Sequence, residues 1–187
     1  MTALENILEH SSEMYLKYGL RSVSMDDIAR SLSISKKTLY QHIGSKQSLV
    51  SLIADYLLSV FSMHLAFLNE QNELDDKNHL SYVATYILAF SQENYRFLKD
   101  LERYYHAIWE VFNLKQTNAI SKIIEPIYVK LKNKQQIKNT VNKEVFEYIF
   151  LEACRLSGFS YTNEHNREYE LQALELLIDG LFKNSEN

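Results

Sequence analysis

The fold is decided near the N-terminus, where residues 24–43 read S-M-D-D-I-A-R-S-L-S-I-S-K-K-T-L-Y-Q-H-I. Ser24 followed three residues later by Asp27 is typical of a helix N-terminus, because each side chain can pair with a free backbone N–H of the first turn. Ser35 is a second candidate for such a cap. The pattern predicts two short helices, 25–31 and 36–43, whose close spacing is that of a helix-turn-helix unit.

The second of these helices presents polar side chains on one face and apolar ones on the other. In helix-turn-helix proteins the second helix enters the major groove of DNA, and its N-terminal residues meet base edges. Lysine can donate to guanine O6 and N7, glutamine can pair with adenine, and hydroxyl groups suit phosphates. The predicted DNA-binding residues are Ser24, Ser35, Lys36, Lys37, Thr38, Tyr40, Gln41, His42 and Lys46.

The charge distribution indicates a local basic surface on an acidic protein. The chain has a formal net charge of −4, yet no Asp or Glu occurs between Ile28 and Ala54, where Arg30, Lys36, Lys37 and Lys46 lie. A small basic module on an acidic chain is compatible with DNA binding. The alternative is a solvated basic face on an ordinary helical bundle. The two capped helices, the short turn and the missing acidic residues occur together, and this combination favours DNA binding.

The remainder of the chain predicts an all-α protein. The 187 residues include four Gly and one Pro, whereas average usage of the two together is roughly 12%, and turn-rich β folds need more of both. Gly19 and Gly44 are expected to end the helices before them, and Pro126 is expected to kink or interrupt its helix. Apolar residues at helical spacing predict further helices, about nine in all, over 3–18, 45–68, 79–93, 95–112, 114–133, 143–158 and 166–183.

No motif predicts catalysis, a metal site or a cofactor. A single Cys excludes a disulfide framework, and the sequence has no zinc-ligand spacing, phosphate loop, nucleophile elbow or paired E-x-x-H motif. No uninterrupted apolar run reaches the roughly 18 residues of a membrane span, and the polar N-terminus does not resemble a signal peptide. A cytoplasmic protein with no membrane partner is expected. A small helical enzyme and a helical adaptor remain alternatives, although an adaptor would leave the basic stretch unexplained.

Residues 19–49 resemble the DNA-binding domain of TetR-family transcriptional regulators. The chain departs from the family pattern at Ser33, Lys37, Ile43 and Gln47. These departures leave the core and phosphate-contact positions in place, and Lys37 could extend base readout. The matching positions are Gly19, Ser24, Ile28, Ala29, Ser35, Thr38, Leu39, Tyr40, His42, Lys46 and Leu49.

This resemblance implies an all-α homodimer with no enzymatic activity. Residues 1–47 would form the helix-turn-helix DNA-binding domain, helix 45–68 would connect the domains, and residues 48–187 would form the ligand-binding and dimerisation domain. The implied partners are a double-stranded DNA operator and an unknown small-molecule effector. The implied function is that of a repressor released from a palindromic operator when the effector binds.

Aromatic residues are concentrated in the predicted helices between residues 79 and 133. A buried Tyr needs a partner for its hydroxyl, and aromatic side chains with a few polar groups are typical of small-molecule pockets. Ordinary core packing is the alternative for any one of them. The predicted pocket residues are Tyr82, Tyr86, Phe90, Tyr104, Tyr105, Trp109 and Tyr128.

The last two predicted helices are apolar over two faces. A helix of this kind must be covered on two sides, either by neighbours of the same chain or by a second copy. We expect a two-fold dimer interface, which would match a palindromic operator. The predicted interface residues are Ile149, Ala153, Leu156, Leu174, Leu177, Ile178 and Leu181.

Overall fold

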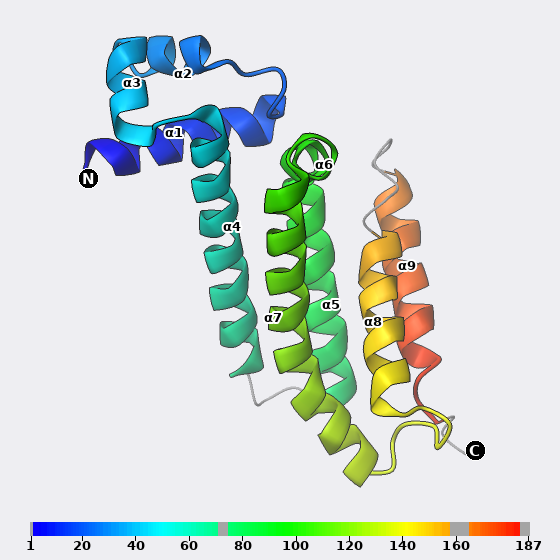
Figure 1. The fold of residues 1–187 in the computed structure, drawn as a ribbon. Coiled ribbons are helices and arrows are strands. Elements are labelled where there is room, and N and C mark those ends of the chain that lie inside the picture. Colours follow the sequence, from blue (N-terminus) through cyan, green and yellow to red (C-terminus); the bar gives the residue numbers. More distant parts are fainter. Residues whose placement is uncertain (1, 71–74, 158–164, 184–187) are drawn as a thin grey trace. The chain divides into compact units, whose positions relative to one another are not determined.

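The computed structural model describes residues 2–70, 75–157 and 165–183, and this part of the chain folds into helices, as expected (Figure 1). The side chains of residues 153, 155–157, 165–168 and 170 lie outside the described part. In chain order the described helices are α1 (Ala3–Tyr18), α2 (Met25–Ser31), α3 (Lys36–Ile43), α4 (Lys46–Asn69), α5 (Asp76–Glu93), α6 (Tyr95–Tyr104), α7 (His106–Asn133), α8 (Lys143–Ser157) and α9 (His165–Asp179).

The chain packs as two compact units. The first unit combines Met1–Val60 with Glu93–Lys115, and the second combines Phe61–Gln92 with Gln116–Asn187. Helices α4 and α7 each contribute to both units. The functional division expected from the sequence, 1–47 and 48–187, remains a prediction.

Side-chain caps fix the starts of the three N-terminal helices. The Thr2 side chain accepts from Glu5 N and the Glu5 carboxylate accepts from Thr2 N, which closes a capping box on α1. Ser24 caps α2 and Ser35 caps α3, as predicted. Helices α2 and α3 pack on α1 and on each other. The fully buried side chains at this centre are Tyr15, Ile28, Leu39 and Leu49, and each buried apolar side chain of this size stabilises the fold by roughly 1.5–3 kcal/mol.

Helix α6 belongs to the same unit and packs against α1. The Arg96 guanidinium donates to Lys17 O at 2.7 Å, which occupies a carbonyl in the last turn of α1. The backbone N–H of Arg21 donates to Asp100 Oδ2 at 3.2 Å, and its Nη1 donates to the Tyr104 hydroxyl at 3.3 Å. The turn between α1 and α2 is therefore bonded to α6.

Gly19 ends α1 and makes this close contact with α6 possible. Its N–H donates to Tyr15 O at 2.8 Å, and its φ is +85°. Residues with a Cβ rarely adopt this backbone angle. A Cβ built at this position would lie 2.8 Å from Asp100 Oδ2. The backbone angle therefore favours glycine strongly, and a Cβ here would also force the Asp100 carboxylate to shift.

The second unit includes α5 and also α8 and α9, which pack side by side (Figure 1). Phe146 and Phe150 of α8 are fully buried. The segment between α7 and α8 also contributes two buried residues, Ile137 and Val141. Backbone bonds join this segment to the residues that follow α9, from Lys138 N to Leu181 O and from Lys183 N to Gln136 O. They flank an antiparallel bridge between Ile137 and Phe182.

Several predicted helix boundaries were wrong. The break expected near residue 113 lies at Tyr105, so that α6 is short and α7 runs for 28 residues. Pro126 does not interrupt its helix, since α7 continues through it. Helix α9 ends at Asp179, so Gly180 follows the helix instead of lying inside it.

Helix α4 has the length and composition of a membrane-crossing helix, with a mean hydropathy of 1.7 over its most apolar window. Several of its apolar side chains are buried within the two units, among them Leu49, Val50, Phe61 and Leu65. Of this window 44% is buried, and the exposed apolar side chains of α4 include Leu52, Tyr56, Met63 and Phe67.

Candidate nucleic-acid interface

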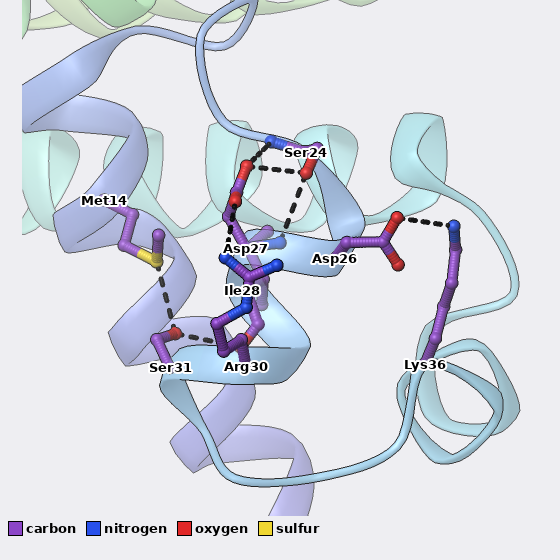
Figure 2. A network of polar contacts seen from close by, with 8 residues as sticks. All are labelled: Met14, Ser24, Asp26, Asp27, Ile28, Arg30, Ser31 and Lys36. Carbon is purple, nitrogen blue, oxygen red and sulfur yellow. Dashed lines mark hydrogen bonds and ion pairs between the residues drawn. The ribbon is translucent and has the colours of Figure 1, made fainter.

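The start of α2 is held by a reciprocal network between Ser24 and Asp27 (Figure 2). Asp27 N donates to Ser24 Oγ at 3.2 Å, while Asp27 Oδ2 accepts from Ser24 N at 2.9 Å and from Ser24 Oγ at 2.6 Å. These bonds lower the pKa of Asp27, because they stabilise its charged form. The Ser24 hydroxyl already donates its proton to Asp27, so a phosphate contact from this hydroxyl would require that bond to open.

Helix α3 separates its residues between the interior and the solvent as predicted. Leu39 and Ile43 are buried against the rest of the unit. The N-cap hydroxyl of Ser35 accepts from Thr38 N at 3.0 Å and lies 2.7 Å from Thr38 Oγ1. Of the remaining predicted contact residues, Thr38 is half-buried, and the exposed ones are Lys36, Lys37, Tyr40, Gln41 and His42.

The two lysines at the start of α3 differ in their surroundings. Lys36 Nζ lies 2.9 Å from Asp26 Oδ2 on α2, and this carboxylate raises the pKa of Lys36. Lys37 is exposed and makes no ion pair or hydrogen bond within the described part of the chain. The Lys37 side chain is therefore available to a base edge or a phosphate without breaking an existing bond.

Lys46, predicted to contact phosphate, is held inside its own unit. Its Nζ donates to Leu20 O at 2.6 Å and to Val23 O at 2.7 Å, and it lies 5.6 Å from the centre of the Tyr15 ring. Burial lowers the pKa of Lys46, an effect opposed by Asp100 and Asp27. Two of its three donors stabilise the turn between α1 and α2, a role that the sequence could not reveal because backbone carbonyls leave no signature in it.

The predicted pocket residues are distributed over both units. In the second unit, Tyr86 stacks on Phe61 and lies near Phe90, Tyr128 packs on Phe146, and Tyr82 is exposed. In the first unit, Tyr104 bonds to Arg21, Trp109 stacks on Phe112, and Tyr105 is half-buried. Within each unit these aromatics thus have packing partners of their own, and a shared pocket remains a prediction.

The predicted dimer residues fall into two groups. Leu174, Ile178 and Leu181 are buried in the packing of their own chain, whereas Leu177 is exposed and Ile149 is half-buried. The side chains of Ala153 and Leu156 lie outside the described residues. The exposed large apolar residues of α8 and α9 are Val145, Tyr148, Tyr169, Leu176 and Leu177.

The described residues contain no group of three or more His, Cys, Asp or Glu side chains placed to hold a metal ion. Cys154 is buried, and burial raises the pKa of its thiol. A thiol in this environment is a poor nucleophile at neutral pH, because the thiolate is the reactive form.

Three comparisons with known proteins extend these observations. A family model described as "Bacterial regulatory proteins, tetR family" matches residues 7–53, which include α2 and α3 and most of α1. The biofilm operon negative transcriptional regulator IcaR of Staphylococcus aureus is 24% identical over 148 residues, which cover 77% of this chain and 68% of IcaR.

Solved structures share the fold of the chain. The ketosteroid transcriptional regulator KstR2 of Mycobacterium tuberculosis superposes with a TM-score of 0.73 at 13% identity and covers 98% of this chain and 96% of its own. AibR, solved in complex with isovaleryl coenzyme A and operator DNA, gives a TM-score of 0.67 at 18% identity, with 96% and 97% covered. The capped helix-turn-helix unit, the family match over it and the shared all-helical fold agree, and the chain belongs to the TetR family of DNA-binding transcriptional regulators, which are not enzymes.

Proposed function

We propose that this protein is a homodimeric repressor of the bacterial cytoplasm that leaves a palindromic operator when a small molecule binds. The observation that carries the proposal is the exposed face of α3. There Lys37, Tyr40, Gln41 and His42 face solvent, while Leu39 and Ile43 fix the helix to its unit. Lysine and glutamine near the start of such a helix can read guanine and adenine edges.

Two relatives support the finer parts of this proposal. IcaR is described as a negative regulator, which favours repression. AibR was solved with both isovaleryl coenzyme A and operator DNA, which favours response to a small molecule. In this chain the Tyr104 hydroxyl on α6 bonds to Arg21 beside the DNA-reading unit. An effector that displaces α6 would therefore disturb the turn before α2.

The outer face of α8 and α9 supports dimerisation. Tyr148, Tyr169 and Leu176 are each about two-thirds exposed or more, at 67%, 68% and 73%. Exposed apolar patches often mark protein interfaces, and these two neighbouring helices carry several exposed apolar side chains. We assign the interface to this face, with Leu177 and Ile149 at it and with Leu174, Ile178 and Leu181 supporting it from within.

The DNA-binding proposal is tested by selecting bound sequences from a random duplex library and measuring affinity by gel shift. We expect the wild-type protein to enrich one palindrome. The double variant Lys37→Ala/Tyr40→Ala should bind it about 100-fold more weakly, since two base or phosphate contacts are lost. The control Lys17→Ala/Tyr18→Ala removes another lysine and another tyrosine, at the end of α1, and should retain affinity. Enrichment of no sequence would leave the adaptor as the better interpretation.

The dimer proposal is tested by sedimentation equilibrium at micromolar concentration. Leu176→Glu places a charge on the exposed face of α9 and should give monomers, because an unpaired charge at an apolar interface is costly. Leu114→Glu alters a leucine of α7 that is also exposed, at 62%, and should remain dimeric. A monomeric wild-type protein would refute this part of the proposal.

A further inference from the structure

Two acidic side chains, Asp26 and Asp27, lie in the first turn of α2, and Asp27 is occupied by the Ser24 cap. Asp26, in the first turn of α2, directs its carboxylate at Lys36, the first residue of α3 (Figure 2). The Oδ2 and Nζ atoms are 2.9 Å apart, and both side chains are about half exposed, at 55% and 52%. A carboxylate at a surface that approaches DNA repels phosphate, so its presence there needs a reason.

The backbone on both sides of this pair is fixed. The capping box of Ser24 and Asp27 orients the first turn of α2, and the Ser35 cap orients the first turn of α3. Because both backbones are held, the pair forms with less loss of freedom than an ion pair between mobile segments. The Asp26 hydrogen bond and charge keep Lys36 firmly protonated by raising its pKa.

This pairing changes what Lys36 can do at DNA. An ammonium group has three donors, and Asp26 accepts one of them. The remaining donors can still reach the O6 and N7 acceptors of a guanine, but the neighbouring carboxylate weakens the attraction of Lys36 to phosphate. Lys37, which has no such partner among the described residues, keeps its full attraction to phosphate.

We propose that Asp26 is a specificity determinant of operator recognition, which positions Lys36 for one base edge and keeps it out of non-specific phosphate contacts. Asp26 acts through Lys36 and is therefore a positioning residue. The inference rests on the DNA-binding function of the chain. It predicts that removing the carboxylate strengthens binding to arbitrary DNA and weakens discrimination.

The test compares Asp26→Asn with the wild-type protein by fluorescence anisotropy on two duplexes of equal length. One duplex is the sequence that the wild-type protein selects from a random library, and the other is its scrambled version. Asp26→Asn should bind the scrambled duplex roughly fivefold more tightly at moderate salt, with a salt slope steeper by about 0.9, the value for one added phosphate contact. Affinity for the selected duplex should change less than twofold, so that the specificity ratio falls several-fold.

Three further variants show whether the effect depends on Lys36 and on the negative charge of Asp26. In a Lys36→Met background, Asp26→Asn should no longer change the specificity ratio, because the ammonium group through which Asp26 acts is absent. Asp26→Glu keeps the charge and should keep the ratio. Asp55→Asn removes the acid of another exposed ion pair, Asp55 with Lys115 at 3.0 Å, and should leave both affinities unchanged.

Each contrary result has a defined meaning. An unchanged ratio in Asp26→Asn overturns the proposal, and so does an equal change in the Lys36→Met background or in Asp55→Asn. If the wild-type protein selects a palindrome but the Asp26 variants give one of these contrary results, only the role of Asp26 is refuted. If the wild-type protein selects no sequence, the proposed function and the role of Asp26 fall together.

Discussion

The helix pairs α2–α3 and α8–α9 bury one face in the same way and differ in the other. Ile28 and Leu39 secure the first pair, as Phe146 and Ile178 secure the second. The outer face of α3 is polar and cationic, whereas the outer faces of α8 and α9 carry exposed Tyr and Leu. The inner faces of both pairs stabilise the fold. The outer face of α3 suits a negatively charged polymer, whereas the outer faces of α8 and α9 suit an apolar partner.

The largest effects should come from the inner faces. Ile178→Ala and Leu39→Ala each remove a buried aliphatic side chain and should lower the free energy of unfolding by about 3 kcal/mol. Their outer-face counterparts, Leu177→Ala and Gln41→Ala, should cost less than about 0.5 kcal/mol at low protein concentration. Urea unfolding monitored by circular dichroism measures all four. A loss for Gln41→Ala as large as that for Leu39→Ala would contradict the division between faces.

Lys46 should contribute to folding, whereas Lys37 should contribute to DNA binding alone. Lys46→Met removes two hydrogen bonds from a charged donor to the carbonyls of the α1–α2 turn. We expect a loss of about 1.5–2 kcal/mol in the free energy of unfolding, as is usual for bonds to charged groups. Lys37→Met removes the same charge from an exposed position and should leave stability unchanged while weakening DNA binding. Equal stability of the two variants would return Lys46 to the phosphate-contact role expected from the sequence.

The cap of α2 should contribute less to the free energy of unfolding than the buried aliphatic side chains or Lys46 do. Ser24→Ala removes the hydroxyl that accepts from Asp27 N and should cost about 1 kcal/mol. Ser59→Ala is the matched control, because the Ser59 hydroxyl donates only to Tyr56 O within α4. Hydrogen exchange should show faster exchange in α2 for Ser24→Ala alone. Equally fast exchange in α8 and α9 of Ser24→Ala would show that the cap does not act on α2 alone.

The smallest effect should be on the free energy of unfolding at acidic pH. Hydrogen bonds lower the pKa of Asp27 at the start of α2 and of Asp75 before α5. A carboxylate whose pKa is lower when folded stabilises the protein above its unfolded value and loses that contribution as the pH falls through the folded value. Both contributions should therefore be complete at neutral pH and disappear below about pH 4. Acid titration of Asp27→Asn and Asp75→Asn should show a weaker dependence on pH than the wild-type protein over that range.

The sequence predicted the DNA-reading unit well because its signals are local. Ser24, Asp27 and Ser35 act within three residues of themselves, so the bounds of α2 and α3 were correct. The break at Tyr105 was missed because Tyr104, Tyr105 and His106 are not residues that typically cap a helix. Local rules also cannot show which carbonyls need a donor, so the bonds of Lys46 to Leu20 O and Val23 O were not predicted. Its phosphate contact stays a prediction.

The two faces of α9 illustrate a different limit. Both are apolar, and periodicity shows that two faces exist without showing which one meets the rest of the chain. Leu174 and Ile178 were expected at the partner and are buried within the unit, while Leu176 is exposed. Only the packing of α8 and of the segment carrying Ile137 decides between the faces.

Gly19 and Asp100 form a contact whose consequence reaches beyond stability. Any larger residue at position 19 would be strained at its φ and would push against the Asp100 carboxylate on α6. The residues tolerated at position 19 therefore depend on the residue at position 100, although the two positions are far apart in the sequence. A shorter side chain at position 100 removes the clash but also the bond to Arg21 N, and the strain at position 19 would persist. We expect libraries randomised at both positions to return glycine at 19 almost without exception, and a wider choice at 100.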